Sequence, residues 1–102
     1  MKTEWTRSDG VLKINLAGER DKYTAPAVRA ECDRLIDRNQ GVRKVIINLA
    51  EVAFMDSTGI GFLIGRYKRA QRCGMQLMVE RPNFAADKVL SVSGIYSLIP
   101  RV

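Results

Sequence analysis

The feature that most constrains the fold is a run of branched apolar residues near the middle of the chain. Residues 45–49 read Val-Ile-Ile-Asn-Leu, so only Asn48 interrupts the run. β-Branched side chains favour extended backbone, and a run this short and apolar is typical of a strand covered on both faces. We therefore expect residues 45–49 to form the central strand of a sheet.

Before this strand, the sequence predicts a hairpin and then a helix. Residues 3–7 and 11–16 predict two strands joined by a tight turn, and the second strand alternates apolar and polar side chains. Thr24 is expected to cap a helix that runs to about Gln40 and is ended by Gly41. The apolar face of this helix is expected to consist of Val28, Cys32, Leu35 and Ile36.

After the central strand, helical and strand patterns alternate again. We expect a helix from the turn at 56–59 to about Cys73, a strand over 75–79, a helix that ends before Gly94, and a last short extended piece over 95–99. The apolar face of the first of these helices is expected to consist of Ile60, Leu63, Ile64 and Tyr67. Phe62 lies off that face, so it is either partly exposed for a partner or packed under a neighbouring helix.

Length and composition limit both the size of the fold and its chemistry. The chain has 102 residues, 46% of them hydrophobic, which predicts a single domain over residues 1–102 with one core. The expected class is α/β (α+β mixed), with a mixed four- to five-stranded sheet packed with three to four helices. There is no histidine, and Cys32 and Cys73 have no zinc-site spacing. We expect no enzymatic activity, no metal, no cofactor and, without a secretory signal or membrane-length apolar run, a cytoplasmic location.

The turn before the second helix is the strongest candidate for a functional site. Ser57 and Thr58 follow Asp56 at a position where a helix presents unpaired backbone N–H groups. A hydroxyl residue there most often caps the helix and contributes about 1 kcal/mol, and spacing alone favours that interpretation. The alternative is phosphorylation, because the helix dipole and the N–H groups favour an anion. A phosphate beside Asp56 would gather about three negative charges on one edge and disfavour a partner made for a neutral hydroxyl.

The sequence around this turn resembles the STAS-domain family of anti-sigma factor antagonists. The resemblance spans nearly the whole chain, and its helical Gly-Arg-Tyr-Lys stretch is most similar to the sporulation (stage II) antagonists of spore-forming bacteria. Arg20 departs from the pattern, in which an apolar residue is usual. The segments that carry the resemblance are Phe54-Met55-Asp56-Ser57-Thr58-Gly59-Ile60-Gly61, Gly65-Arg66-Tyr67-Lys68, Gly18-Glu19-Arg20-Asp21, Asn48-Leu49 and Val92-Ser93-Gly94.

The resemblance implies a STAS-like fold and a partner-switching function in sporulation or stress transcription. The unphosphorylated protein would bind an anti-sigma factor that is also a serine kinase, and the sigma factor would be released. Phosphorylation of Ser57 by that kinase would reverse this, and a PP2C-type phosphatase would restore the free serine. Thr58 is the second choice of phosphoacceptor. The partner-binding residues that the resemblance implies are Asp21, Asp56, Ser57, Thr58, Ile60 and Phe62.

Three other functions remain open at this point. A STAS module can also serve as a scaffold or stress-signalling subunit without direct sigma release. The net charge of +6 would suit nucleic acid, but Lys and Arg are spread along the chain instead of forming one patch with aromatic residues, so no nucleic acid partner is expected. An enzyme could use Cys73 or the Asp56–Ser57 pair as nucleophile, but no base is placed to activate either.

Overall fold

The computed structural model describes residues 3–16 and 23–102. The described part forms four strands, three α-helices and one 3₁₀ turn, and this confirms the predicted mixed α/β class. The strands are β1 (Thr3–Ser8), β2 (Val11–Leu16), β3 (Lys44–Asn48) and β4 (Gln76–Glu80); the helices are α1 (Pro26–Arg38), α2 (Ser57–Arg72) and α3 (Phe84–Ser93); and the 3₁₀ turn is Ile95–Ser97.

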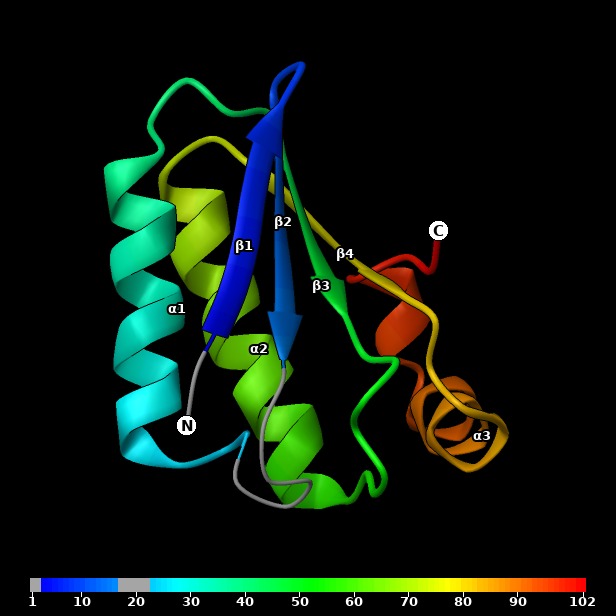
Figure 1. Cartoon of the computed structure of the whole chain (residues 1–102). Coiled ribbons are helices and arrows are strands. Elements are labelled where there is room, and N and C mark those ends of the chain that lie inside the picture. Colours follow the sequence, from blue (N-terminus) through cyan, green and yellow to red (C-terminus); the bar gives the residue numbers. More distant parts are fainter. Residues whose placement is uncertain (1–2, 17–22) are drawn as a thin grey trace.

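The sheet has the strand order β1-β2-β3-β4, with one antiparallel pair followed by two parallel pairs. The antiparallel pair is the predicted hairpin, and Asp9 and Gly10 in its turn have φ values of +53° and +77°. Two positive φ values give a turn whose twist matches that of the strands. The parallel pairs need long crossovers, which α1 and α2 supply. Because the strands advance in one direction, both helices lie on the same face of the sheet, and α3 lies beyond β4 (Figure 1).

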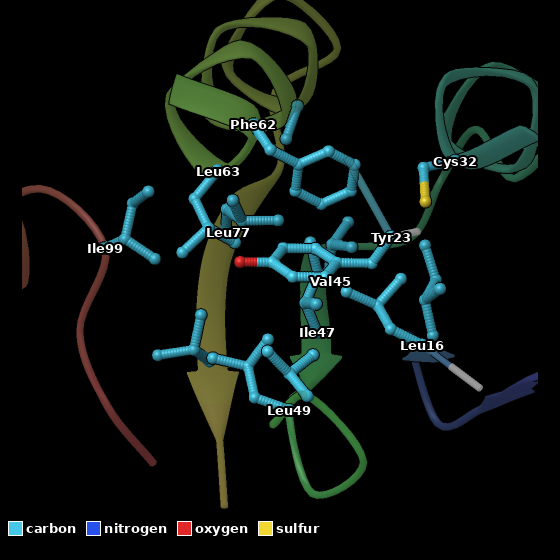
Figure 2. Packing of buried hydrophobic residues seen from close by; sticks show 14 of the residues in the cluster. Leu16, Tyr23, Cys32, Val45, Ile47, Leu49, Phe62, Leu63, Leu77 and Ile99 are labelled. Atoms are coloured by element: carbon cyan, nitrogen blue, oxygen red, sulfur yellow. The ribbon is translucent and has the colours of Figure 1, made fainter. Parts of the chain in front are cut away.

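This arrangement corrects the expectation that the central strand is covered on both faces. β3 does lie between β2 and β4, and Val45 and Ile47 are fully buried against the helices. Ile46 and Asn48 point to the opposite face and are only partly buried. Figure 2 shows the buried face of the sheet, with Val45 and Ile47 below Phe62 and Leu63 of α2.

The start of α1 differs from the prediction. Thr24 does not cap this helix: the N-cap is Ala25, and it makes no side-chain hydrogen bond. Pro26 follows as the first helical residue. Its ring fixes φ near the helical value and its nitrogen carries no N–H, so a proline start leaves one donor fewer for a cap to satisfy.

The end of α1 also lies earlier than predicted. The helix stops at Arg38 instead of about Gln40 because Asn39 takes the C-cap position, where its side-chain N–H₂ group donates to the carbonyl of Leu35 (2.7 Å). Gly41 lies in the turn that follows, with φ of +94°.

The expected extended piece over residues 95–99 is instead the 3₁₀ turn Ile95–Ser97. Ile95 and Ile99 are both buried, and a helical turn brings both side chains to the same side. The backbone N–H of Ile99 donates to the carbonyl of Ile95 (2.8 Å). Extended pairing begins only at Arg101, which bridges to β4.

The one-sided core predicts that neighbouring positions of β3 differ in their contribution to stability. We expect Ile47→Ala to lower the free energy of unfolding by about 2–5 kcal/mol, because it opens a cavity at a fully buried position. The matched change Ile46→Ala acts on the partly buried face, and we expect a loss of about 1 kcal/mol. Urea denaturation measures both, and equal losses would contradict a core on one face only.

Candidate functional site

The N-terminus of α2 is capped by Asp56. Its Oδ1 atom accepts hydrogen bonds from the backbone N–H groups of Thr58 (3.0 Å) and Gly59 (3.1 Å), and its backbone carbonyl accepts one from Ile60 (3.0 Å). The interpretation of Ser57 or Thr58 as the cap is therefore wrong. A carboxylate already occupies the place that an anion would take at this helix end, where it also interacts favourably with the helix dipole.

Because Asp56 performs the capping, the Ser57 hydroxyl is not needed to hold the helix. Ser57 is the first residue of α2 and its side chain is exposed, as is that of Thr58. Among residues 3–16 and 23–102, no side chain or backbone group forms a hydrogen bond with the Ser57 hydroxyl. A group attached to this oxygen would therefore project outward, at the edge of the domain.

The face that α2 buries overlaps only in part with the one predicted. Leu63 is buried as expected, but Ile60, Ile64 and Tyr67 are only partly buried, and the remaining buried positions of the helix are Gly59, Phe62, Arg66 and Ala70. The buried cation explains the difference, because apolar periodicity does not predict that Arg66 points inward. Its Nε atom lies 2.8 Å from Oδ1 of Asp33 in α1, and its guanidinium lies 5.0 Å from the centre of the Phe62 ring.

Phe62 is 3% exposed, so of its two possible roles the structure shows packing. The expectation that its ring contacts a partner is corrected accordingly, because the ring lies in the core and not on the surface. Ile60, one turn from Asp56, remains partly exposed near Ser57.

The basic residues of α2 are not a single docking patch. Arg66 pairs with Asp33, and Arg69 approaches both Asp33 (3.5 Å) and Asp37 (3.6 Å) of α1. These ion pairs join the two helices. Arg69 and Arg72 also lie in the last turn, where positive charge complements the helix dipole.

An apolar groove begins at Ser57 and continues to α3. It has a volume of about 550 Å³, and its lining residues are Ser57, Ile60, Lys88, Val89, Val92 and Ser93. Val92 is 81% exposed, which is unusual for a valine in a helix. The sequence does not reveal this groove, because tertiary packing decides which side of α3 faces α2. Only Val92 could be noticed beforehand, as part of the Val92-Ser93-Gly94 segment.

The turn before α2 is also held by Tyr23, whose role no sequence pattern indicates. Its hydroxyl donates a hydrogen bond to the backbone carbonyl of Phe54 (3.1 Å). Burial and the nearby Asp56 carboxylate raise the pKa of Tyr23 to about 12, so the hydroxyl keeps its proton at neutral pH.

The remaining candidate residues are an acidic residue of the loop after β2 and the two cysteines. Asp21, the expected partner contact in the acidic loop, lies outside them. Cys32 is a core residue, as predicted, and burial raises the pKa of its thiol to about 12. Cys73 is partly buried, with its Sγ atom 3.4 Å from Nε2 of Gln40.

Two further properties bear on the class of protein. Within the described ranges, no group of three or more His, Cys, Asp or Glu residues is arranged to hold a metal ion. No helix in this part of the chain has the length and apolar character needed to span a membrane.

The sequence and the fold match a known family. The model of the STAS domain matches residues 2–102, and the chain therefore belongs to the STAS domain family. The chain is similar to the anti-sigma F factor antagonist of Paenibacillus polymyxa, with 33% identity over 100 residues that cover 98% of this chain and 85% of that protein. It is also 29% identical to the anti-sigma-B factor antagonist of Bacillus subtilis, over 91% of this chain and 83% of that protein.

Solved structures confirm the STAS fold. The unphosphorylated anti-sigma factor antagonist SpoIIAA superposes with a TM-score of 0.76 at 24% identity, covering 99% of this chain and 88% of that one. The phosphorylated form of the Bacillus cell fate determinant SpoIIAA gives 0.69 at 24% identity, with 99% and 91% covered. A STAS domain protein from Planctomyces limnophilus gives 0.80 at 22% identity, with 97% and 87% covered.

The division of roles between Asp56 and Ser57 predicts different effects on stability. We expect Asp56→Ala to lower the free energy of unfolding by about 0.5–2 kcal/mol, because two backbone N–H groups lose their acceptor. Asp56→Asn keeps a capping oxygen and should retain most of the stability. Ser57→Ala should stay within about 0.5 kcal/mol of wild type in urea denaturation. A large loss for Ser57→Ala would mean that the serine hydroxyl is structural.

Proposed function

We propose that this chain is an anti-sigma factor antagonist whose binding to an anti-sigma factor is switched by phosphorylation of Ser57. The observation that carries the proposal is an exposed Ser57 hydroxyl at the edge of an apolar groove, with helix capping performed by Asp56. Family membership and relatives named as antagonists of anti-sigma F and anti-sigma-B factors support it.

In the unphosphorylated state, the proposed binding surface combines apolar and acidic groups. Ile60 and the exposed Val92 supply apolar area that a partner can bury. Outside that groove, the exposed Asp56 and Thr58 at the same helix end supply charge and a neutral hydroxyl. Asp21 belongs to the proposed surface through the family resemblance. The buried ring of Phe62 packs α2 onto the core and does not touch the partner. Binding of the anti-sigma factor to this surface releases the sigma factor.

Phosphorylation changes the charge of this surface without removing any interaction that holds the fold. The phosphate adds about 1.5–2 negative charges beside the Asp56 carboxylate. Lys88 lines the same groove and offsets part of this charge, but the net change remains strongly negative. An interface formed around a neutral hydroxyl then faces a hydrated dianion, which must lose water without gaining a matching cation.

The anti-sigma factor is proposed to be the serine kinase itself, and a PP2C-type phosphatase restores the free hydroxyl. The chain then acts as a substrate and a binding module and not as an enzyme. Because the relatives include antagonists of both sigma F and sigma B regulators, the proposal covers either regulon.

Phosphate mapping with the cognate anti-sigma factor and ATP tests the switch. We expect ³²P incorporation into wild type and into the matched control Thr58→Ala, and none into Ser57→Ala. In binding measurements, Ser57→Ala should match unmodified wild type, because the hydroxyl holds no part of the fold. Ser57→Asp should bind at least about tenfold more weakly, although one carboxylate mimics phosphate incompletely. Phosphate on Thr58 alone, or stable binding without sigma release, would contradict the proposal.

The acidic loop gives a separate prediction. If Asp21 pairs with a basic group of the anti-sigma factor, Asp21→Asn should weaken binding and flatten its dependence on salt concentration. The control is Asp9→Asn, which makes the same charge change in the β1–β2 turn, at the end of the sheet away from the N-terminus of α2 (Figure 1). Isothermal titration at two ionic strengths measures both effects. Equal behaviour of the two variants would rule out this contact.

A further inference from the structure

Tyr23 is a loop residue with the burial of a core residue. It lies between β2 and α1, directly after the segment that carries Asp21, yet it is only 5% exposed. Its ring meets the ring of Phe62 edge to face, with 5.6 Å between centroids and an interplanar angle of 84° (Figure 2). This geometry suits the quadrupoles of the two rings and fixes the tyrosine against α2.

The hydroxyl of Tyr23 reaches the turn that leads into α2. It donates to the backbone carbonyl of Phe54, and it lies 3.5 Å from Sδ of Met55. Both residues come directly before Asp56, the N-cap. The side chain of Phe54 is 62% exposed, so the turn is held at this point through its backbone and not through packing of that ring.

Gly59 shows how closely the tyrosine approaches α2. A Cβ atom at this position would lie 2.2 Å from the Tyr23 hydroxyl oxygen and 2.5 Å from Sδ of Met55. Glycine inside a helix costs about 0.5–1 kcal/mol relative to alanine, so its presence here needs a reason. By contrast, a Cβ at Gly61 would meet no described atom within 4 Å.

We propose that Tyr23 is the positioning residue of the Ser57 switch, fixing the 54–56 turn and presenting Ser57 to its kinase, and that Gly59 makes room for it. This inference rests on the proposed function for its effect on phosphorylation, but not for its geometry. It also joins the two parts of the proposed partner surface, because one residue connects the segment after Asp21 to the turn before Ser57. Tyr23 acts through the turn and does not itself contact the reacting atoms.

The first test needs no partner and uses Tyr23→Phe, which keeps the ring on Phe62 and removes only the hydroxyl. We expect faster hydrogen exchange at the amides of Thr58 and Gly59, whose acceptor is Asp56, and unchanged exchange at Ile47 in β3. Equal exchange at Thr58 and Gly59 in both proteins would overturn the assigned role. A uniform rise that includes Ile47 would also overturn it, because it would indicate general destabilisation.

The second test is a double-mutant cycle between Tyr23→Phe and Gly59→Ala, with Gly61→Ala as the matched control. Gly59→Ala should raise the unfolding equilibrium constant strongly in wild type, and by a smaller factor in the Tyr23→Phe background. The closest contact, at 2.2 Å, is then absent, while the one with Sδ of Met55 (2.5 Å) remains in both. Gly61→Ala should show no such coupling. Additive effects of Tyr23→Phe and Gly59→Ala would overturn the claim that Gly59 accommodates the hydroxyl.

The third test measures phosphorylation of Ser57 by the cognate anti-sigma factor kinase. Tyr23→Phe should lower kcat/KM by about tenfold, because a displaced turn presents the hydroxyl in the wrong place. Equal kcat/KM for the two proteins would overturn the inference while leaving the proposed function intact. Absence of phosphorylation in wild type would instead refute the proposed function, and the two partner-free tests would still decide whether Tyr23 fixes the turn.

Discussion

The N-cap formed by Asp56, whose Oδ1 atom accepts two backbone hydrogen bonds, is the interaction on which the rest of the site depends. One carboxylate oxygen satisfies the backbone N–H groups of Thr58 and Gly59, and this fixes where α2 begins. A serine in the N-cap position would have its hydroxyl engaged by the same donors, so a modification there would also change the cap. With the aspartate in that position, the next residue begins the helix with a free, outward side chain. The fold therefore separates the group that stabilises the helix from the hydroxyl that we propose to be phosphorylated.

The surroundings of Ser57 support the proposed role of its hydroxyl. An apolar groove runs from it towards α3, so a partner that covers the groove must also approach the hydroxyl. Below the surface, Phe62 packs on Tyr23, and the Arg66 guanidinium lies over Phe62 and pairs with Asp33 of α1. The turn and the first helical residues thus pack on a cluster of buried side chains. A charge added on the outer side of such a cluster changes what can bind to the surface more than it changes the fold.

Much of the fold could be predicted from the sequence, because strands, helices and the hairpin follow from local periodicity and turn residues. The errors share a cause, which is that tertiary contacts decided between local alternatives. The buried face of α2 differs from the predicted one because it includes Arg66, whose ion pair with Asp33 allows it to lie inside. β3 has one open face because two crossovers in the same direction leave one side of the sheet without helices. The turn at 56–59 was located, but whether Asp56, Ser57 or Thr58 caps the helix depends on backbone geometry, and the groove and Tyr23 involve contacts across the chain.

The central claim is that a phosphate on Ser57 blocks an interface while the domain stays folded. The most direct measurement compares the fully phosphorylated protein with the unmodified protein in two quantities: the affinity for the anti-sigma factor and the Tm. The account predicts at least about a tenfold loss of affinity, with no loss of Tm beyond a few degrees. Undiminished affinity, or a loss that appears only together with unfolding, would contradict it.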